Sequence, residues 1–298
     1  MQTVNEEKRA YWMYIASLLI VGTIGAVRRY IPLSSGLLAF VRGLIGGLSL
    51  LVFVKLRGRR VLGGIDRKKL AWLVLTGAAL GFNWMLLFEA YSYTTVAIAT
   101  LCYYFEPTIL LLLSPLLFKE RLSGRKLLCA ALAVLGMVLV SGVVGQGGLR
   151  GEQLRGVLCG LGAACFYTAV VILNKKIRDV DPYGRTIVQL FSAALVLLPY
   201  LLLTEKPGQI HLSAGLICLL LLIGVVYTGL VYALYFGSMP NLKAQTIAIL
   251  SYLDPVVALF VSVLLLGERL TLFGILGAVL ILGAALLSEW SPGQGRGN

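Results

Sequence analysis

Three ionisable side chains lie inside long apolar runs of this 298-residue chain: Arg42, Glu106 and Asp254. A charge in the hydrocarbon core of a bilayer costs roughly 2.5–3.5 kcal/mol even on a lenient scale, so such residues are functional candidates. We expect Glu106 and Asp254 to line a cavity, where they attract a cationic group or carry protons as coupling sites. The alternative is that they pair with Arg42 or accept hydrogen bonds that fix helix packing.

A proline follows each of the two carboxylates, as Pro107 and Pro255. Proline lacks a backbone donor and frees a carbonyl one turn earlier in a helix, here that of Tyr103 or Ser251. Kinked segments are tolerated in a membrane where they face protein or a watered cavity. We therefore predict hinges at both prolines, and a lining role for the same segments stays open.

Aromatic and amide side chains recur on the faces of neighbouring apolar runs. Trp84, Tyr103 and Tyr232 are expected to line the cavity, where they would suit an amine through cation–π contacts or an aromatic amino acid through stacking. An aromatic belt at the membrane interface is the alternative for such residues. Asn83 could hydrogen-bond a substrate or a neighbouring helix. The predicted substrate-binding set is therefore Glu106, Asp254, Tyr103, Trp84, Tyr232, Asn83 and Arg42.

The composition places most of the chain in lipid. Hydrophobic residues make up 59% of it and charged residues 13%, whereas soluble domains carry about 25% charged residues. A helix needs about 20 residues to cross the hydrocarbon core, and charged or Gly/Pro-containing breaks divide the chain accordingly. We predict an all-α integral membrane protein with ten transmembrane helices, at 11–27, 33–54, 70–91, 95–118, 126–144, 154–174, 183–203, 212–238, 243–266 and 272–289.

The basic residues predict the orientation of these helices. The net charge of +13 comes from short clusters between the apolar runs, which argues against nucleic acid as a partner. Lysine and arginine are enriched in cytoplasmic loops, and they gather after the second span and in alternate loops thereafter. Both termini should therefore face the cytoplasm in a bacterial inner membrane. Arg28 and Arg29, in an external loop, go against this rule.

The chain contains an internal repeat. Shifting it by 148 residues places Tyr104-Phe105-Glu106-Pro107 on Tyr252-Leu253-Asp254-Pro255, and the triplet Glu120-Arg121-Leu122 on Glu268-Arg269-Leu270. This offset corresponds to five helices, and an odd number forces the second copy to insert upside down. We predict inverted repeats at residues 1–148 and 149–298, with the substrate site near the membrane midplane between them.

Three features of the chain form a pattern: five plus five helices, an apolar helix that runs through a proline into Lys119-Glu120-Arg121-Leu122 and Gly267-Glu268-Arg269-Leu270, and Arg42 in the second helix. This pattern resembles the EamA-type members of the drug/metabolite transporter superfamily. The resemblance covers nearly the whole chain. It implies a secondary transporter or facilitator, often an exporter of amino acids or related metabolites. The small multidrug relatives carry a glutamate in their first helix, and residues 11–27 contain none, so proton-coupled drug efflux does not follow.

The leading hypothesis is transport of a small polar metabolite by alternating access, outward by analogy. An organic-cation transporter is the alternative. A membrane-embedded hydrolase built on two carboxylates is remote, because HExxH and GxGD motifs are absent. We expect no catalytic residues, cofactor or metal site, since the chain has one histidine and no CxxC pair. The expected partners are the substrate and the lipid bilayer. One chain holds both halves, so we expect a monomer to be sufficient for transport. A dimer is the alternative.

Overall fold

A computed structural model describes residues 2–59, 61, 63, 65–118, 124–140, 151–174, 177, 179–205, 213–242 and 244–289. The regular structure of these residues is helical throughout, which confirms the predicted all-α class. Glu120 and the histidine at 211 lie outside the described residues.

Helices occupy each of the ten predicted membrane spans. Seven described helical stretches are long and apolar enough to cross a membrane, and the remaining three spans are formed by the shorter helices α7, α13 with α12, and α14. The helices in chain order are α1 (Gln2–Val21), α2 (Ile24–Arg28), α3 (Ser35–Leu56), α4 (Arg67–Tyr93), α5 (Val96–Tyr103), α6 (Glu106–Phe118), α7 (Gly124–Val140), α8 (Gly151–Asn174), α9 (Pro182–Thr204), α10 (Ala214–Leu221), η2 (Leu222–Leu230), α11 (Val231–Ser238), η3 (Met239–Asn241), α12 (Ala244–Ser251), α13 (Leu253–Leu266) and α14 (Leu272–Glu289).

The helices begin where a short polar side chain satisfies a free backbone N–H group. Ser34, Asp66, Thr95, Asp181 and Ser213 accept such bonds at the starts of α3, α4, α5, α9 and α10. The first N–H groups of a helix have no partner within it, so a side-chain acceptor at this position stabilises the start by about 1 kcal/mol. These residues fix where five of the helices begin.

Several spans are interrupted near their middles. Tyr104 and Phe105 separate α5 from α6, and Tyr252 separates α12 from α13. Pro107 and Pro255 therefore lie in the first turn of a new helix, where proline is tolerated because the first N–H groups lack partners anyway. The sequence predicted a kink within one helix; the structure places a short interruption of the helix before each proline, two residues long in the first case and one in the second. The hinge role itself stays a prediction.

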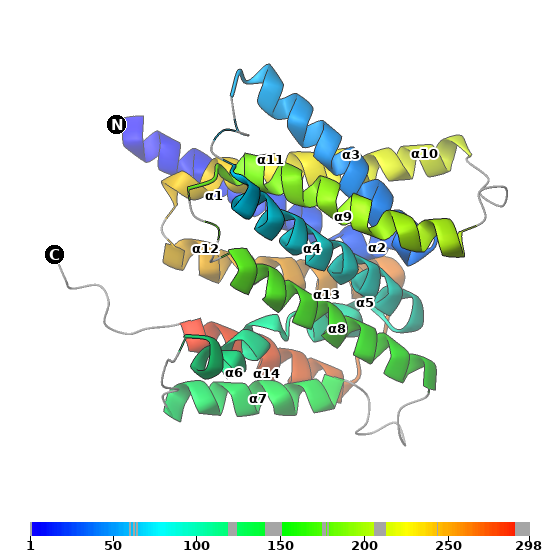
Figure 1. Cartoon of the computed structure of the whole chain (residues 1–298). Helices are drawn as coiled ribbons and strands as arrows, with labels where there is room; N and C mark the ends of the chain where they lie inside the picture. Colours follow the sequence, from blue (N-terminus) through cyan, green and yellow to red (C-terminus); the bar gives the residue numbers. More distant parts are fainter. Residues whose placement is uncertain are drawn as a thin grey trace.

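The start of α1 and the end of α14 lie on one side of the bundle, which we call the terminal side, and the α4–α5 turn lies on the other, which we call the distal side (Figure 1). Helix α4 packs on α3, α8 and α9, α3 packs on α9, and α7 packs on α14. Glycine allows the closest of these contacts, since a Cβ atom on Gly136 would lie 2.7 Å from the carbonyl oxygen of Gly277. Tight backbone contact of this kind is typical of helices in lipid.

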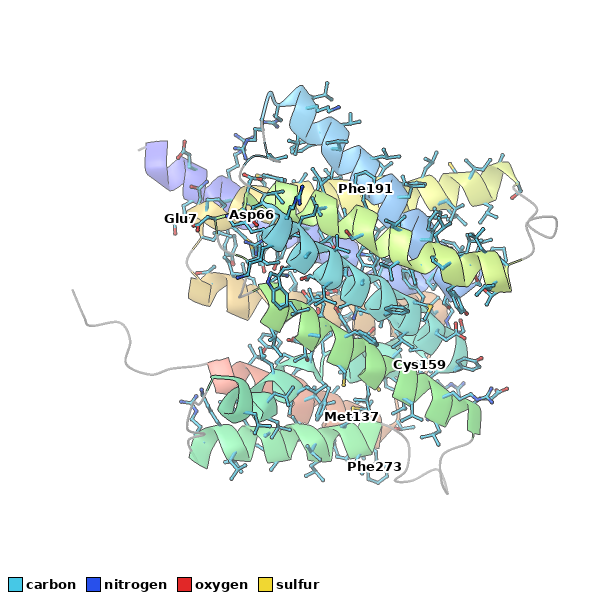
Figure 2. All side chains as sticks on the ribbon, in the orientation of Figure 1. Glu7, Asp66, Met137, Cys159, Phe191 and Phe273 are labelled. Carbon is cyan, nitrogen blue, oxygen red and sulfur yellow. The ribbon has the colours of Figure 1, made fainter. Side chains whose placement is uncertain are left out.

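Large apolar side chains cover the outside of the bundle, as the periphery in Figure 2 shows. Leu203 is 88% exposed and Leu116 is 80% exposed, whereas the polar residues Arg42, Asn83 and Thr228 are buried. A protein surrounded by lipid requires this distribution, with apolar groups outside and polar groups inside. The chain is therefore a multi-pass membrane protein whose buried charges lie among packed helices.

Candidate functional site

Arg42 lies buried in the bundle on α3, and its contacts hold the guanidinium in place. Its Nε donates to Oγ1 of Thr228 at 3.1 Å. The guanidinium carbon lies 4.1 Å from the ring centre of Trp84 and 5.8 Å from that of Phe88. Stacking on an aromatic face leaves the edge of a guanidinium free to donate hydrogen bonds in its own plane. We call Arg42, Trp84, Thr228 and Tyr232 the arginine cluster.

The backbone around Thr228 explains why these two side chains meet. Thr228 belongs to the π-helix η2, and its hydroxyl donates to the carbonyl of Ile223, five residues earlier, at 3.0 Å. A Cβ atom on Gly46 would lie 2.4 Å from the Thr228 side chain. Glycine at this position is therefore required for α3 and η2 to approach so closely. Single π-helical turns inside α-helices often mark functional sites.

Asp254 begins the second half of its span, in the first turn of α13. Its carboxylate accepts a hydrogen bond from the hydroxyl of Tyr104, which lies in the break between α5 and α6. The broken segment of one half of the chain thus contacts the carboxylate of the other half. Asp254 does not form the ion pair with Arg42 that the sequence left open as an alternative. Among the described residues the one ion pair joins Arg29 and Glu268.

Tyrosines surround Asp254 and Glu106. The ring centre of Tyr103 lies 5.7 Å from that of Tyr104 and 5.6 Å from that of Tyr167. Glu106 follows Tyr103 by three residues, and its backbone carbonyl accepts a hydrogen bond from Oγ1 of Thr168, the neighbour of Tyr167 in the chain, at 3.5 Å. We call Asp254, Glu106, Tyr103, Tyr104 and Tyr167 the aspartate cluster. It presents carboxylate oxygens among aromatic rings.

The two clusters are neighbours, because Tyr103, Tyr167 and Tyr232 pack against the same core that contains the buried Trp84. Tyr232 packs on Phe236, with ring centres 5.9 Å apart. The structure thus brings together six of the seven predicted site residues. Their binding roles stay predictions.

Asn83 is the seventh predicted site residue, and it contacts a neighbouring helix. Its Nδ2 donates to the carbonyl of Ala163 on α8 at 2.7 Å. Its Oδ1 is buried and accepts no hydrogen bond from the described residues. The contact with Ala163 favours the packing interpretation, while the unpaired oxygen is a free acceptor inside the bundle.

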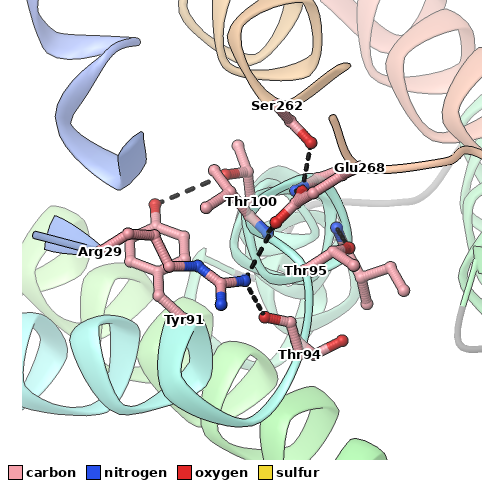
Figure 3. Close-up of polar contacts among 10 residues, drawn as sticks. Arg29, Tyr91, Thr94, Thr95, Thr100, Ser262 and Glu268 are labelled. Atoms are coloured by element: carbon pink, nitrogen blue, oxygen red, sulfur yellow. Dashed lines mark hydrogen bonds and ion pairs between the residues drawn. The ribbon is translucent and has the colours of Figure 1, made fainter. Parts of the chain in front are cut away.

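A second polar constellation joins separate segments on the distal side (Figure 3). Glu268 accepts from Arg29 Nη2 at 3.0 Å and from the backbone N–H groups of Val96 and Ala97 at 3.0 and 3.3 Å. Ser262 also donates to this carboxylate. A carboxylate at the start of α5 is favoured by the free N–H groups and the helix dipole. We call Glu268 and these four partners the distal clamp.

The distal clamp also explains why Arg29 goes against the loop-charge rule. Arg29 Nη2 donates both to Glu268 and to the carbonyl of Thr94 at 2.9 Å. The neighbouring Arg28 is buried and donates to the carbonyl of Ile31 at 2.9 Å and to the hydroxyl of Ser92 at 3.3 Å. Both arginines therefore have structural partners on the distal side. A hint was present in the repeated Glu-Arg-Leu triplet, although it did not identify the partners.

The terminal side carries a cavity of about 290 Å³ between α1, α3, α9 and α11. Charged and aromatic side chains line much of it. They are Glu6, Arg9, Phe53, Arg57, Arg59 and Tyr183. The sequence analysis treated these arginines only as orientation signals. The cavity is separate from the predicted midplane residues, which do not line it.

Comparison with known proteins agrees with this architecture. Over 284 residues the chain is 30% identical to the uncharacterized transporter YxxF of Bacillus subtilis, covering 95% of this chain and 90% of that protein. It is 30% identical to a probable amino-acid metabolite efflux pump of Salmonella typhimurium, over 59% of this chain and 61% of that protein. A crystal structure at 21% identity matches the fold with a TM-score of 0.65, covering 94% of this chain and 97% of that one.

The family comparison covers nearly the whole chain in two parts. Residues 8–142 and residues 154–290 each match the EamA-like transporter family. The resemblance expected from the sequence is therefore confirmed. This chain belongs to the EamA-like transporter family, and it is a membrane transporter.

Proposed function

We propose that this transporter moves a small zwitterionic metabolite, an amino acid or a related compound, by alternating access. The observation that carries the proposal is a pair of opposite charges inside the bundle, the buried Arg42 on α3 and the part-buried Asp254 on α13, which do not bond to each other. A buried charge needs a partner, since its desolvation costs several kcal/mol. A substrate carboxylate can supply one for Arg42, and a substrate ammonium one for Asp254.

The repeat architecture supports a moving pair of halves. Helix α1 begins on the terminal side and α8 on the distal side (Figure 1), as an inverted second copy requires. Contacts also exchange between copies: α4 packs on α8 and α9, while the equivalent η2 and α11 pack on α3 and α1. Inverted repeats allow one half to rock against the other around a central site. We therefore place the repeats at 1–148 and 149–298, and one chain then contains a whole transport unit.

The two ends of the bundle support alternating access in particular. The distal clamp joins residues of both halves, while the terminal side carries a cavity between α1, α3, α9 and α11. We assign this arrangement to a state closed on the distal side. With the termini in the cytoplasm of a bacterial inner membrane, this state would load substrate for export. The names of two relatives as amino-acid metabolite efflux pumps favour that direction.

The test is a thermal-stability screen of the purified protein against amino acids and their amides, because a ligand that binds the folded state raises the melting temperature. We expect free amino acids to stabilise the protein and the amides, which lack the carboxylate, to stabilise it less. Asp254→Asn and Arg42→Gln should each abolish the shift and reduce uptake into proteoliposomes at least tenfold. Thr204→Val, at the lipid-exposed end of α9, is the matched control.

A second candidate is an organic cation, which the tyrosines of the aspartate cluster favour. Aromatic faces beside a carboxylate suit a quaternary ammonium through cation–π contacts. In the same screen a quaternary amine would then stabilise the protein without needing Arg42. If Arg42→Gln and Asp254→Asn both transport amino acids normally, the zwitterion proposal is wrong.

A further inference from the structure

The terminal-side cavity lies where the two halves of the chain meet. Helices α1 and α3 form one wall of it, and α9 and α11 form the other. Its volume of about 290 Å³ is at the lower end of the range found for small-molecule pockets. The cavity therefore has the size for a compact metabolite and lies on a path between the halves.

The charged residues of the cavity are mostly positive. Arg9, Arg57 and Arg59 face one acid, Glu6, and among the described residues none of the three forms an ion pair with it. The guanidinium of Arg57 lies 5.3 Å from the ring centre of Phe53, and that of Arg59 lies 5.5 Å from that of Tyr183. A guanidinium supported by an aromatic face keeps its N–H edge for a planar anion, which it binds with two hydrogen bonds.

The deeper part of the cavity is apolar and aromatic. Tyr183 is buried, and its hydroxyl is already engaged as a donor to the carbonyl of Ala233 at 3.3 Å. The small residues Ala10, Ala233 and Gly237 complete this part. A Cβ atom on Gly237 would lie 3.0 Å from the Tyr183 hydroxyl. The cavity thus combines a cationic rim with an apolar interior, which suits an anionic group on a small apolar body.

Aromatic contacts connect this cavity with the central charges. The ring of Tyr183 lies 6.1 Å from that of Phe236, which lies 5.9 Å from that of Tyr232 in the arginine cluster. Phe236 also contacts Tyr235 at 5.2 Å, and Tyr235 packs on Tyr14 at 5.2 Å. An anion held in the cavity would therefore lie one aromatic layer from the residues around Arg42.

We propose that this cavity is a second, outer binding site, which captures a carboxylate or phosphate group on the terminal side before the molecule reaches the central charges. The role of this cavity as the loading site for substrate rests on the proposed function. The same chemistry would also bind the phosphate of an anionic lipid headgroup. Arg57 and Arg59 supply the anion contacts, and Phe53 and Tyr183 hold them in place.

Benzoate is the first probe, with neutral benzamide as its matched analogue and inorganic phosphate as the second anion. Binding is measured by titration calorimetry in neutral detergent. We expect benzoate and phosphate to bind and benzamide to bind at least tenfold more weakly. The double variant R57Q/R59Q should lower benzoate affinity roughly tenfold. The double variant R67Q/K68Q removes the same charge from exposed residues of the same side outside the cavity, and it should bind as the wild type does.

Two further arms locate the site and the source of the anion. Asp254→Asn should keep benzoate binding, since the outer site is separate from the central one; this separates the outcome from that of the proposed function. The wild type is also placed in nanodiscs that contain anionic lipid. Weaker benzoate binding there would mean that lipid headgroups enter the cavity, and the natural anion would then be a lipid phosphate. Equal benzoate binding by R57Q/R59Q and R67Q/K68Q, or loss of binding in Arg42→Gln alone, would overturn the proposal.

Discussion

The two ends of the bundle use arginine in opposite ways. On the distal side Arg29 meets a carboxylate that also accepts two backbone N–H groups, so opposite charges join helices of both halves. On the terminal side three arginines share a cavity with one acid and form no ion pair with it among the described residues. Attraction favours a closed end, while like charges repel and favour an open one.

If the proposed alternating access is correct, this comparison predicts that the balance of charge at each end selects the state of the transporter. The clamp carboxylate is 10% exposed, and shielding from water strengthens its interactions. The cavity arginines are exposed, and their charge stays available to a solute. One end is therefore held by internal bonds, and the other keeps its arginines available for the anion that we propose binds there.

The largest expected effect is that of Glu268→Ala. This change leaves the N–H groups of Val96 and Ala97 without their acceptor. Unsatisfied hydrogen-bond donors would destabilise the closed distal side by about 1–3 kcal/mol. A cost of about 1.4 kcal/mol shifts an equilibrium tenfold, so the distal side should open at least tenfold more often. The measurement is the rate at which a maleimide added on the distal side labels Thr100→Cys, with the native cysteines replaced. Thr100 is buried on α5 next to the clamp.

Glu152→Ala is the matched control for this change, because Glu152 is an exposed acid at the distal start of α8. It should leave the labelling rate unchanged. Glu268→Gln keeps an acceptor and loses only the charge, so its rate should fall between those of the wild type and Glu268→Ala. Equal labelling in all of these variants would show that the clamp does not hold the distal side closed.

A smaller effect, about fivefold, is expected from salt at the terminal side. Exposed charges are screened over a distance of about 10 Å at 0.1 M salt and about 3 Å at 1 M. Raising salt tenfold should therefore weaken benzoate binding in the cavity of Arg57 and Arg59, measured by calorimetry. The labelling rate of Thr100→Cys should change less than twofold, since Glu268 is largely shielded. Equal salt dependence at the two ends would contradict the comparison.

Length and apolarity were enough to predict the helices, because each span must satisfy its own backbone in lipid. The same reasoning located Arg42, Glu106 and Asp254, since a charge in an apolar run is conspicuous. Arg42 lies beside the predicted Trp84. What could be predicted was therefore local to one helix, or visible as a repeat.

Contacts between distant segments could not be predicted in this way. Tyr104 and Asp254 lie far apart in the chain, and their hydrogen bond depends on two helix breaks that meet in space. The π-helix that presents Thr228 has the same apolar composition as an α-helix. The partners of Glu268 come from three separate segments, and no spacing rule connects them. Tyr104 was still within reach, because it begins the repeated segment that contains Glu106.

The smallest expected effect is that of Arg29→Gln, at about threefold in the same labelling experiment. The side chain of Arg29 is 39% exposed, and ion pairs with an exposed partner contribute about 0–1 kcal/mol. The carboxylate of Glu268 would keep Val96, Ala97 and Ser262 as donors. The closed end should therefore depend more on the capped start of α5 than on the ion pair. If Arg29→Gln instead opens the distal side as far as Glu268→Ala does, attraction between the two charges is the main closing force.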